Sequence, residues 1–163
     1  MVAVKADVEK LLKVGFIYPI ALTEWVSNHV PVEKKQGTIR VCTEFRDLNK
    51  AYPKDNYPNP FIDQIIDACA GSEVFSFMDG FSRYNQIQIK LEDQHKTNFI
   101  CPWGTFVYKK IPFGLKNTGE TFQWAMNFSL HNIKAIVKPY LDDFPAHSCK
   151  RIDHPDHLHL IFE

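Results

Sequence analysis

The hydrophobic residues of this chain follow two spacings, one typical of helices and one typical of strands. Helical spacing is found in residues 7–15, 62–69, 117–131 and 153–163. We expect Asp7 to cap the first helix and Gly15 to end it. In the second helix the spacing places Ile62, Ile65, Ile66 and Cys69 on one face.

Alternation of hydrophobic and polar residues predicts the strands. It is found in residues 25–32, 38–45, 87–91, 97–101 and 105–109, whereas an apolar run predicts the strand of residues 74–79. Short turn segments join the first two and the last two of these strands into hairpins. The strand that ends at Asp79 is almost continuously apolar, which is typical of a buried strand. Helices combined with paired strands predict an α+β fold.

Three acidic residues follow apolar runs and are the candidates for chemistry. Asp142 and Asp143 come after Ile136-Val137, where we expect the tip of a hairpin, and Asp79 closes its own strand. Unpaired buried charge is costly, so adjacent acids either stay solvated or are neutralised by a cation. Carboxylate oxygens suit hard divalent metals, and three acids at two strand ends can hold two magnesium ions. The alternative is an ordinary solvated turn.

Composition sets the bounds of the interpretation. The chain has 163 residues, 45% of them hydrophobic, and a formal net charge of zero. These values predict one folded domain, or two lobes that share strands, and leave a nucleic-acid partner open. The four cysteines form no Cys-x-x-Cys pair, which speaks against zinc. We expect an intracellular protein, cytoplasmic or nuclear, without a signal peptide or membrane span.

Basic residues gather around the first hairpin. Residues 34–54 carry more basic than acidic side chains, and the cations on and after the hairpin are Lys34, Lys35, Arg40, Arg46 and Lys50. Such a segment can be a surface that binds nucleic acid or simply a solvated hairpin.

Several blocks, in this order, resemble the reverse transcriptase region of the Pol polyprotein of gypsy-type LTR retrotransposons. They include Arg40-Val41-Cys42, Phe45-Arg46-Asp47-Leu48-Asn49-Lys50, Phe75-Ser76-Phe77-Met78-Asp79-Gly80, Pro112-Phe113-Gly114-Leu115-Lys116-Asn117, Thr121-Phe122-Gln123 and Tyr140-Leu141-Asp142-Asp143. The resemblance implies a right-handed polymerase with an antiparallel palm sheet packed on helices. Its fingers would be residues 1–53 and 87–112, and its palm residues 54–86 and 113–163. The family continues into thumb, connection and ribonuclease H domains.

The resemblance also implies roles for individual residues. Asp79, Asp142 and Asp143 match the catalytic acids, which hold two Mg²⁺ ions, with Mn²⁺ as a possible substitute. The dNTP-binding positions are Lys35 and Arg40 at the triphosphate, Ser82 and Arg83 through backbone N–H groups, Tyr84 under the deoxyribose, and Phe113 near the base. Lys34, Arg46 and Lys50 would contact nucleic acid.

The implied reaction is nucleotidyl transfer from a dNTP to a primer 3′-end on an RNA or DNA template. Some residues depart from the family: Arg83 replaces a glycine, Glu120 lies near a helix start, and Pro139 and Pro145 flank the acids, where we expect a bent or shortened hairpin. Two alternatives stay open. One is a degenerate relic that folds and at most binds nucleic acid, and the other is a two-metal phosphohydrolase.

Overall fold

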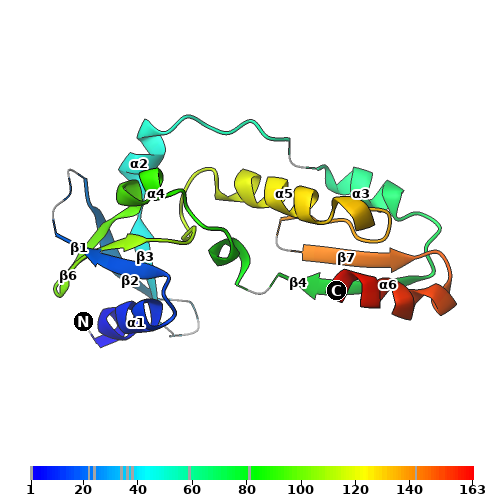
Figure 1. Cartoon of the computed structure of the whole chain (residues 1–163), viewed down its shortest axis with the longest axis horizontal. Helices are drawn as coiled ribbons and strands as arrows, with labels where there is room; N and C mark the ends of the chain where they lie inside the picture. Colours follow the sequence, from blue (N-terminus) through cyan, green and yellow to red (C-terminus); the bar gives the residue numbers. More distant parts are fainter. Residues whose placement is uncertain are drawn as a thin grey trace. The chain divides into compact units, whose positions relative to one another are not determined.

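The chain folds into two compact units in a computed structural model (Figure 1). Unit 1 consists of Met1–Lys54 and Tyr84–Thr118, and unit 2 consists of Asp55–Arg83 and Gly119–Glu163. The structure describes residues 2–21, 23, 25–33, 35, 37, 39–58, 60–80, 82–141 and 143–163. The assignment of fingers and palm to residue ranges stays a prediction. None of the described helices is long and apolar enough to cross a membrane.

Unit 1 is built on a five-stranded sheet with the order β1-β6-β5-β2-β3. Its strands are β1 (Ile17–Ile20), β2 (Ser27–Glu33), β3 (Ile39–Glu44), β5 (Phe99–Cys101) and β6 (Gly104–Tyr108). Its helices are α1 (Val2–Lys13), α2 (Arg46–Ala51) and α4 (Leu91–Gln94), with 3₁₀ turns η1 (Arg83–Gln86), whose first residue belongs to unit 2, and η2 (His95–Thr97). Both predicted hairpins are present, as the antiparallel pairs β2–β3 and β5–β6. β2 also pairs with β5, in the parallel direction, and this pairing joins the two hairpins into one sheet.

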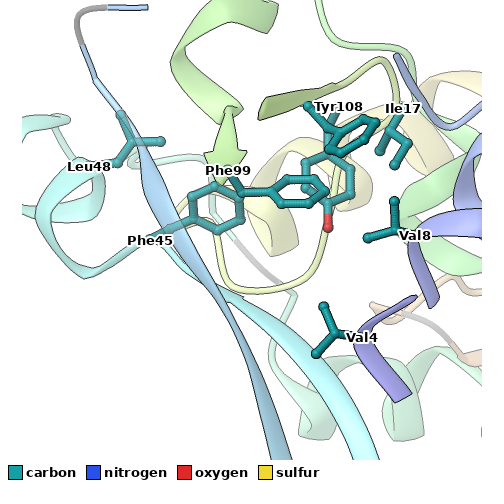
Figure 2. Packing of buried hydrophobic residues seen from close by; sticks show 8 residues of the cluster. Val4, Val8, Ile17, Phe45, Leu48, Phe99 and Tyr108 are labelled. Atoms are coloured by element: carbon teal, nitrogen blue, oxygen red, sulfur yellow. The ribbon is translucent and has the colours of Figure 1, made fainter. Parts of the chain in front are cut away.

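The core of unit 1 gathers aromatic rings from the sheet against α1. Its buried members are Val4, Val8, Ile17, Phe45, Leu48, Phe99, Phe106 and Tyr108, and Figure 2 shows the labelled ones pointing toward one another. The Phe99 ring lies 5.2 Å from the Tyr108 ring and 5.8 Å from the Phe106 ring, between centroids. Packing of this kind fixes α1 on the sheet because aromatic side chains bury large apolar areas.

The start of α1 differs from the prediction. The helix begins at Val2, so Asp7 is an interior residue and not the N-cap. The Asp7 carboxylate lies 3.4 Å from Nε2 of the buried His29 instead. Burial of Val4 and Val8 stabilises the helix toward the amino terminus. A local capping signal contains no information about this packing. Gly15, at φ +71°, ends the helix region as predicted.

Unit 2 pairs two strands and covers them with helices. Its strands are β4 (Val74–Asp79) and β7 (Asp143–Ser148). Its helices are α3 (Ile62–Ala68), α5 (Thr118–Ser129), whose first residue belongs to unit 1, and α6 (His154–Phe162), with 3₁₀ turns η3 (His131–Ile133) and η4 (Arg151–Asp153). β4 and β7 run antiparallel over their full lengths, from Val74 opposite Ser148 to Asp79 opposite Asp143.

A histidine of α6 connects the two strands of unit 2. His154 is buried, and its Nε2 is hydrogen-bonded to Ser76 Oγ on β4 at 2.8 Å. Its Nδ1 is hydrogen-bonded to Ser148 Oγ on β7, also at 2.8 Å. Because successive side chains of a strand point to opposite faces, α6 covers the face that carries Ser76 and Ser148. Asp79 and its strand neighbours Phe77 and Phe75 lie on the other face.

Several predicted elements are wrong. Residues 87–91 form no strand, since the described pairing there is one isolated bridge between Gln88 and Lys110, and α4 begins at Leu91. α2, which follows β3, was missed because its six residues contain few apolar positions. Local periodicity is a weak guide for elements this short.

Burial in unit 2 also differs from the prediction. β4 is not a buried strand, since Phe77 is 80% exposed. Ile62 and Ile66 of α3 are exposed too, and only Cys69 of the predicted face is buried. The alternation within β4 therefore separates a covered face from an open one, which is typical of an antiparallel sheet.

Pro145 does not bend or shorten the hairpin strand. It lies inside β7, opposite Phe77, and the strand continues to Ser148. The Pro145 carbonyl accepts the Lys138 N–H at 3.0 Å, on the side of the incoming chain. In an antiparallel strand the N–H and C=O of one residue point to the same side, so the missing N–H removes no bond to β4. The strand therefore tolerates the proline.

We expect His147 to make the stability of unit 2 depend on pH. The buried His147 is hydrogen-bonded through Nδ1 to Ser72 Oγ at 2.9 Å. Burial above all, with Lys138 and His157, lowers its pKa from the ordinary 6.5. The unfolded chain therefore takes up this proton first as pH falls, so stability is full above pH 6.5 and is lost between 6.5 and the lower pKa of the folded state.

The measurement is urea unfolding at several pH values for the wild type and for His147→Phe, which keeps a ring but has no titrating group. The variant should lose less stability between about pH 7.5 and pH 5 than the wild type does. Equal losses would contradict the prediction, whatever the absolute stability of the variant.

Candidate active site

Two of the three predicted acids meet at the end of the β4–β7 ladder. Asp79, the last residue of β4, is paired with Asp143, the first residue of β7. Residues directly opposite in an antiparallel pair have Cβ atoms about 5 Å apart and point to the same face. Both side chains are exposed. Asp142, the third predicted acid, lies outside the described residues.

The chemistry of the described acids fits a hard divalent cation. Two exposed carboxylates on one face offer oxygen ligands, and their mutual repulsion favours a cation between them. Within the described part of the chain, no group of three or more His, Cys, Asp or Glu residues lies close enough to hold a metal ion. Of the predicted acids, Asp142 is the remaining candidate for a third ligand.

The turn that delivers Asp143 is closed by two backbone hydrogen bonds. The Tyr140 N–H donates to the Asp143 carbonyl at 2.9 Å, and the Asp143 N–H donates to the Tyr140 carbonyl at 3.0 Å. Leu141, inside the turn, has φ +53°, in the left-handed region that disfavours non-glycine residues. Its N–H donates to the side chain of Gln123 on α5. Sequence reasoning missed Gln123 as a site residue, although a glutamine in the buried stripe of a helix is a usable signal.

Arg83 lies beside Asp79. Its Nε is 3.6 Å from Asp79 Oδ1, so the guanidinium is a counter-ion for this carboxylate. Ser82 and Arg83 both have left-handed φ values, +59° and +40°, which glycine adopts at a lower steric cost than other residues. The Arg83 N–H donates to the Gly80 carbonyl at 3.1 Å and is therefore already used within the turn. The contact of this N–H with a phosphate stays a prediction.

In unit 1 the structure brings Tyr84 and Phe113 together. Their ring centroids are 5.1 Å apart at 75°, an edge-to-face contact. Phe113 is 44% exposed, whereas Tyr84 is half-buried. The two predicted dNTP-binding aromatics thus support each other directly.

The predicted basic residues are distributed over β3, α2 and the first hairpin loop. Lys35 is exposed in that loop, while Lys34 and the side chain of Arg40 lie outside the described residues. The Arg40 backbone is paired with Val32 across β2 and β3. Arg46 hydrogen-bonds Glu44 and thereby lowers the pKa of that carboxyl, and Lys50 Nζ lies 3.1 Å from Asp47 Oδ1.

Comparison with known proteins identifies the family. Residues 32–163 match the model of the reverse transcriptase (RNA-dependent DNA polymerase) family. The chain belongs to this family. The Tf2-3 transposon polyprotein of Schizosaccharomyces pombe is 35% identical to this reverse transcriptase domain over 128 residues, which are 78% of the chain. The Tf2-7 polyprotein is 34% identical over the same length.

These relatives confirm the resemblance to reverse transcriptases of gypsy-type LTR retrotransposons. The reverse transcriptase domain spans only 10% of the length of the polyproteins.

Solved structures confirm the α+β fold. The foamy viral protease-reverse transcriptase in complex with an RNA/DNA hybrid has a TM-score of 0.85 at 21% identity. The match covers 98% of this reverse transcriptase domain and 21% of the foamy viral chain. A second structure of that enzyme, in complex with double-stranded DNA, also has a TM-score of 0.85, at 22% identity over 98% of this domain and 28% of that chain.

The Asp79–Asp143 pair predicts a gain in stability from removing one charge. We expect Asp143→Asn to stabilise the metal-free domain by about 0.5 kcal/mol, because like charges directly opposite each other repel. The gain should shrink in high salt, which screens exposed charges.

Urea unfolding at low and high salt measures the effect, and Arg83→Gln provides the comparison. The gain from Asp143→Asn should be larger in the Arg83→Gln background, since Arg83 offsets part of the repulsion. A loss of stability, or a gain that does not respond to salt, would show that the two carboxylates do not repel each other.

Proposed function

We propose that this domain is the fingers and palm part of an RNA-directed DNA polymerase, which transfers a nucleotide from a dNTP to a primer 3′-end. The observation that carries the proposal is the strand register that sets Asp79 opposite Asp143, in a chain of the reverse transcriptase family. The proposed template is RNA or DNA. The match covers only 10% of the length of the related polyproteins, so we also propose that thumb and ribonuclease H domains of a parent polyprotein complete the enzyme.

The proposed catalytic and metal-binding residues are Asp79, Asp142 and Asp143. When bound there, two Mg²⁺ ions, or Mn²⁺ in their place, would supply Lewis acidity toward the primer hydroxyl and the triphosphate. The part of the protein is to hold the carboxylates of Asp79 and Asp143 at fixed positions on one face of the strand pair. The exposure of Asp79 and Asp143 supports this role, because ligands must be reachable by solvated ions and substrate.

We propose that residues of unit 1 bind the dNTP. Lys35 and Arg40 would bind the triphosphate, since an ammonium and a guanidinium both donate hydrogen bonds to phosphate oxygens. Tyr84 would exclude a 2′-hydroxyl by steric conflict, and its edge-to-face contact with Phe113 supports a fixed ring position. Ser82 and Arg83 of unit 2 remain proposed phosphate contacts through their backbone N–H groups.

Nucleic-acid binding is proposed for Lys34, Arg46 and Lys50. Arg46 and Lys50 line one cavity of about 260 Å³ in unit 1, together with Trp25. Cations that neutralise phosphates, next to an exposed aromatic ring on which a base can stack, are typical of sites for single strands. Glu44 and Asp47 line the same cavity, so the two cations must exchange their acidic partners for phosphates.

One observation favours the alternative of a degenerate relic. Arg83, which replaces the family's glycine, supplies the positive charge next to Asp79 that a metal would otherwise supply. The two functions differ in whether the acids bind a divalent cation at all.

Calorimetric titration with Mg²⁺ separates these functions. We expect the domain, mixed with a primer-template and a dNTP, to bind Mg²⁺. The substitutions Asp79→Asn, Asp142→Asn and Asp143→Asn should each weaken this binding at least about tenfold, since even the loss of a residue that only hydrogen-bonds to a metal ligand lowers metal affinity by about that factor. Asp67→Asn, an exposed acid of α3, is the matched control and should bind as the wild type does. Mg²⁺ binding that none of the three substitutions changes would contradict the polymerase proposal and favour the degenerate relic.

Salt dependence tests the nucleic-acid surface. If Arg46 and Lys50 contact phosphates, Arg46→Ala and Lys50→Ala should each reduce the slope of log K against log salt by about 0.7 to 0.9. Fluorescence anisotropy with a labelled primer-template measures the slope. Lys10→Ala on α1 is the control for loss of charge alone, and an equal effect of all three substitutions would argue against a local site.

A further inference from the structure

Gln123 on α5 is a fully buried amide to which neither the acids nor the proposed substrate contacts assign a role. Its side chain is 0% exposed. A buried amide is costly unless its donor and acceptor are both bonded. Here Nε2 donates to the Pro139 carbonyl at 2.9 Å, and Oε1 accepts the Leu141 N–H at 2.7 Å. Both partners belong to the backbone that leads into the turn at residues 140–143.

The two hydrogen bonds lie on either side of Tyr140. A carbonyl at one residue and an N–H two residues later are the groups that a neighbouring strand would pair with. The amide of Gln123 therefore replaces a strand along the incoming arm of the hairpin, where no regular strand is described. It also bonds the N–H of Leu141, the residue in the left-handed region, and so stabilises a conformation that the residue itself disfavours.

A second amide continues the network. Because Pro139 offers a carbonyl and Leu141 an N–H, the Gln123 nitrogen must face the first and its oxygen the second. Gln123 Nε2 also donates to Asn127 Oδ1 at 3.2 Å, one helical turn further along α5. This leaves Asn127 Nδ2 to donate to the Tyr57 hydroxyl at 2.9 Å. The direction of the whole network is therefore determined from the turn to Tyr57.

We propose that Gln123 is a positioning residue for Asp143. It holds Pro139 and Leu141, these residues define the incoming arm, and the Tyr140–Asp143 hydrogen bonds then place Asp143 opposite Asp79. The consequence for metal binding rests on the proposed function, whereas the consequence for the turn does not.

Hydrogen exchange of single amides in the whole chain tests the position of the turn. Gln123→Met keeps the length of the side chain and removes both polar bonds. We expect the Leu141 amide to exchange about tenfold faster in this variant, which is the effect of losing one buried hydrogen bond. This increase should exceed any change in the exchange of the β4 amides that pair with β7. Cys69→Ala, at a buried position of unit 2 on another element, is the control and should change exchange only through global stability.

Gln123→Glu adds a readout that loss of packing would not move. At about pH 8 its carboxylate still accepts from Leu141 but meets the Pro139 carbonyl with a second acceptor. As the pH falls toward about 6, the buried carboxyl takes up a proton and can donate again. We therefore expect Leu141 exchange, after correction for its intrinsic pH dependence, to return toward the wild-type value, while Gln123→Met shows no such return.

Mg²⁺ titration of the same variants completes the test. Gln123→Met should weaken the Asp79-dependent binding several-fold and leave the stoichiometry unchanged. Leu141 exchange that follows global stability alone, or a Gln123→Glu variant without the pH response, would overturn the positioning role. Unchanged Mg²⁺ affinity with a loosened turn would overturn its link to the acids. If the wild type shows no Asp79-dependent Mg²⁺ binding, the polymerase proposal fails, and the exchange data still decide whether Gln123 holds the turn.

Discussion

The register of β4 against β7 is the constraint on which the chemistry of this domain depends. Pairing Val74 with Ser148 at one end puts Asp79 opposite Asp143 at the other. A slip of one residue would move every side chain of a strand to the opposite face and separate the two acids. Holding them together opposes their electrostatic repulsion, so the rest of unit 2 must specify this register strongly.

Two buried polar networks supply that specification from opposite ends. His154 is hydrogen-bonded to Ser76 on one strand and Ser148 on the other, which is possible only in this register. At the other end Gln123 bonds the backbone on both sides of Tyr140. Buried polar groups without partners are costly, so each network penalises alternative pairings more than apolar contacts would. The largest apolar side chains of β4, Phe75 and Phe77, contribute little to this, because they lie on the exposed face.

Much of this fold was predictable because its signals are local. The hairpins β2–β3 and β5–β6 follow from alternation on either side of a short turn, and α5 follows from a long apolar period. The family could also be named from motifs, since Tyr140-Leu141-Asp142-Asp143 and the blocks before it occur in order. The early start of α1 and the exposed face of α3 were not predictable, because they depend on which surfaces meet in the folded unit.

The sequence by itself determined the family, the α+β class and the identity of the candidate acids. These follow from residue types and their order along the chain, which can be read without knowing the contacts. Only the tertiary structure decided that Asp79 meets Asp143, that Arg83 is the counter-ion of Asp79, and that Gln123 bonds the turn. The first and the last of these facts depend on pairing between segments distant in the sequence, and the second depends on the left-handed turn at Ser82 and Arg83. Such pairing is set by the summed burial and hydrogen bonding of the whole unit, which no local window of the sequence contains.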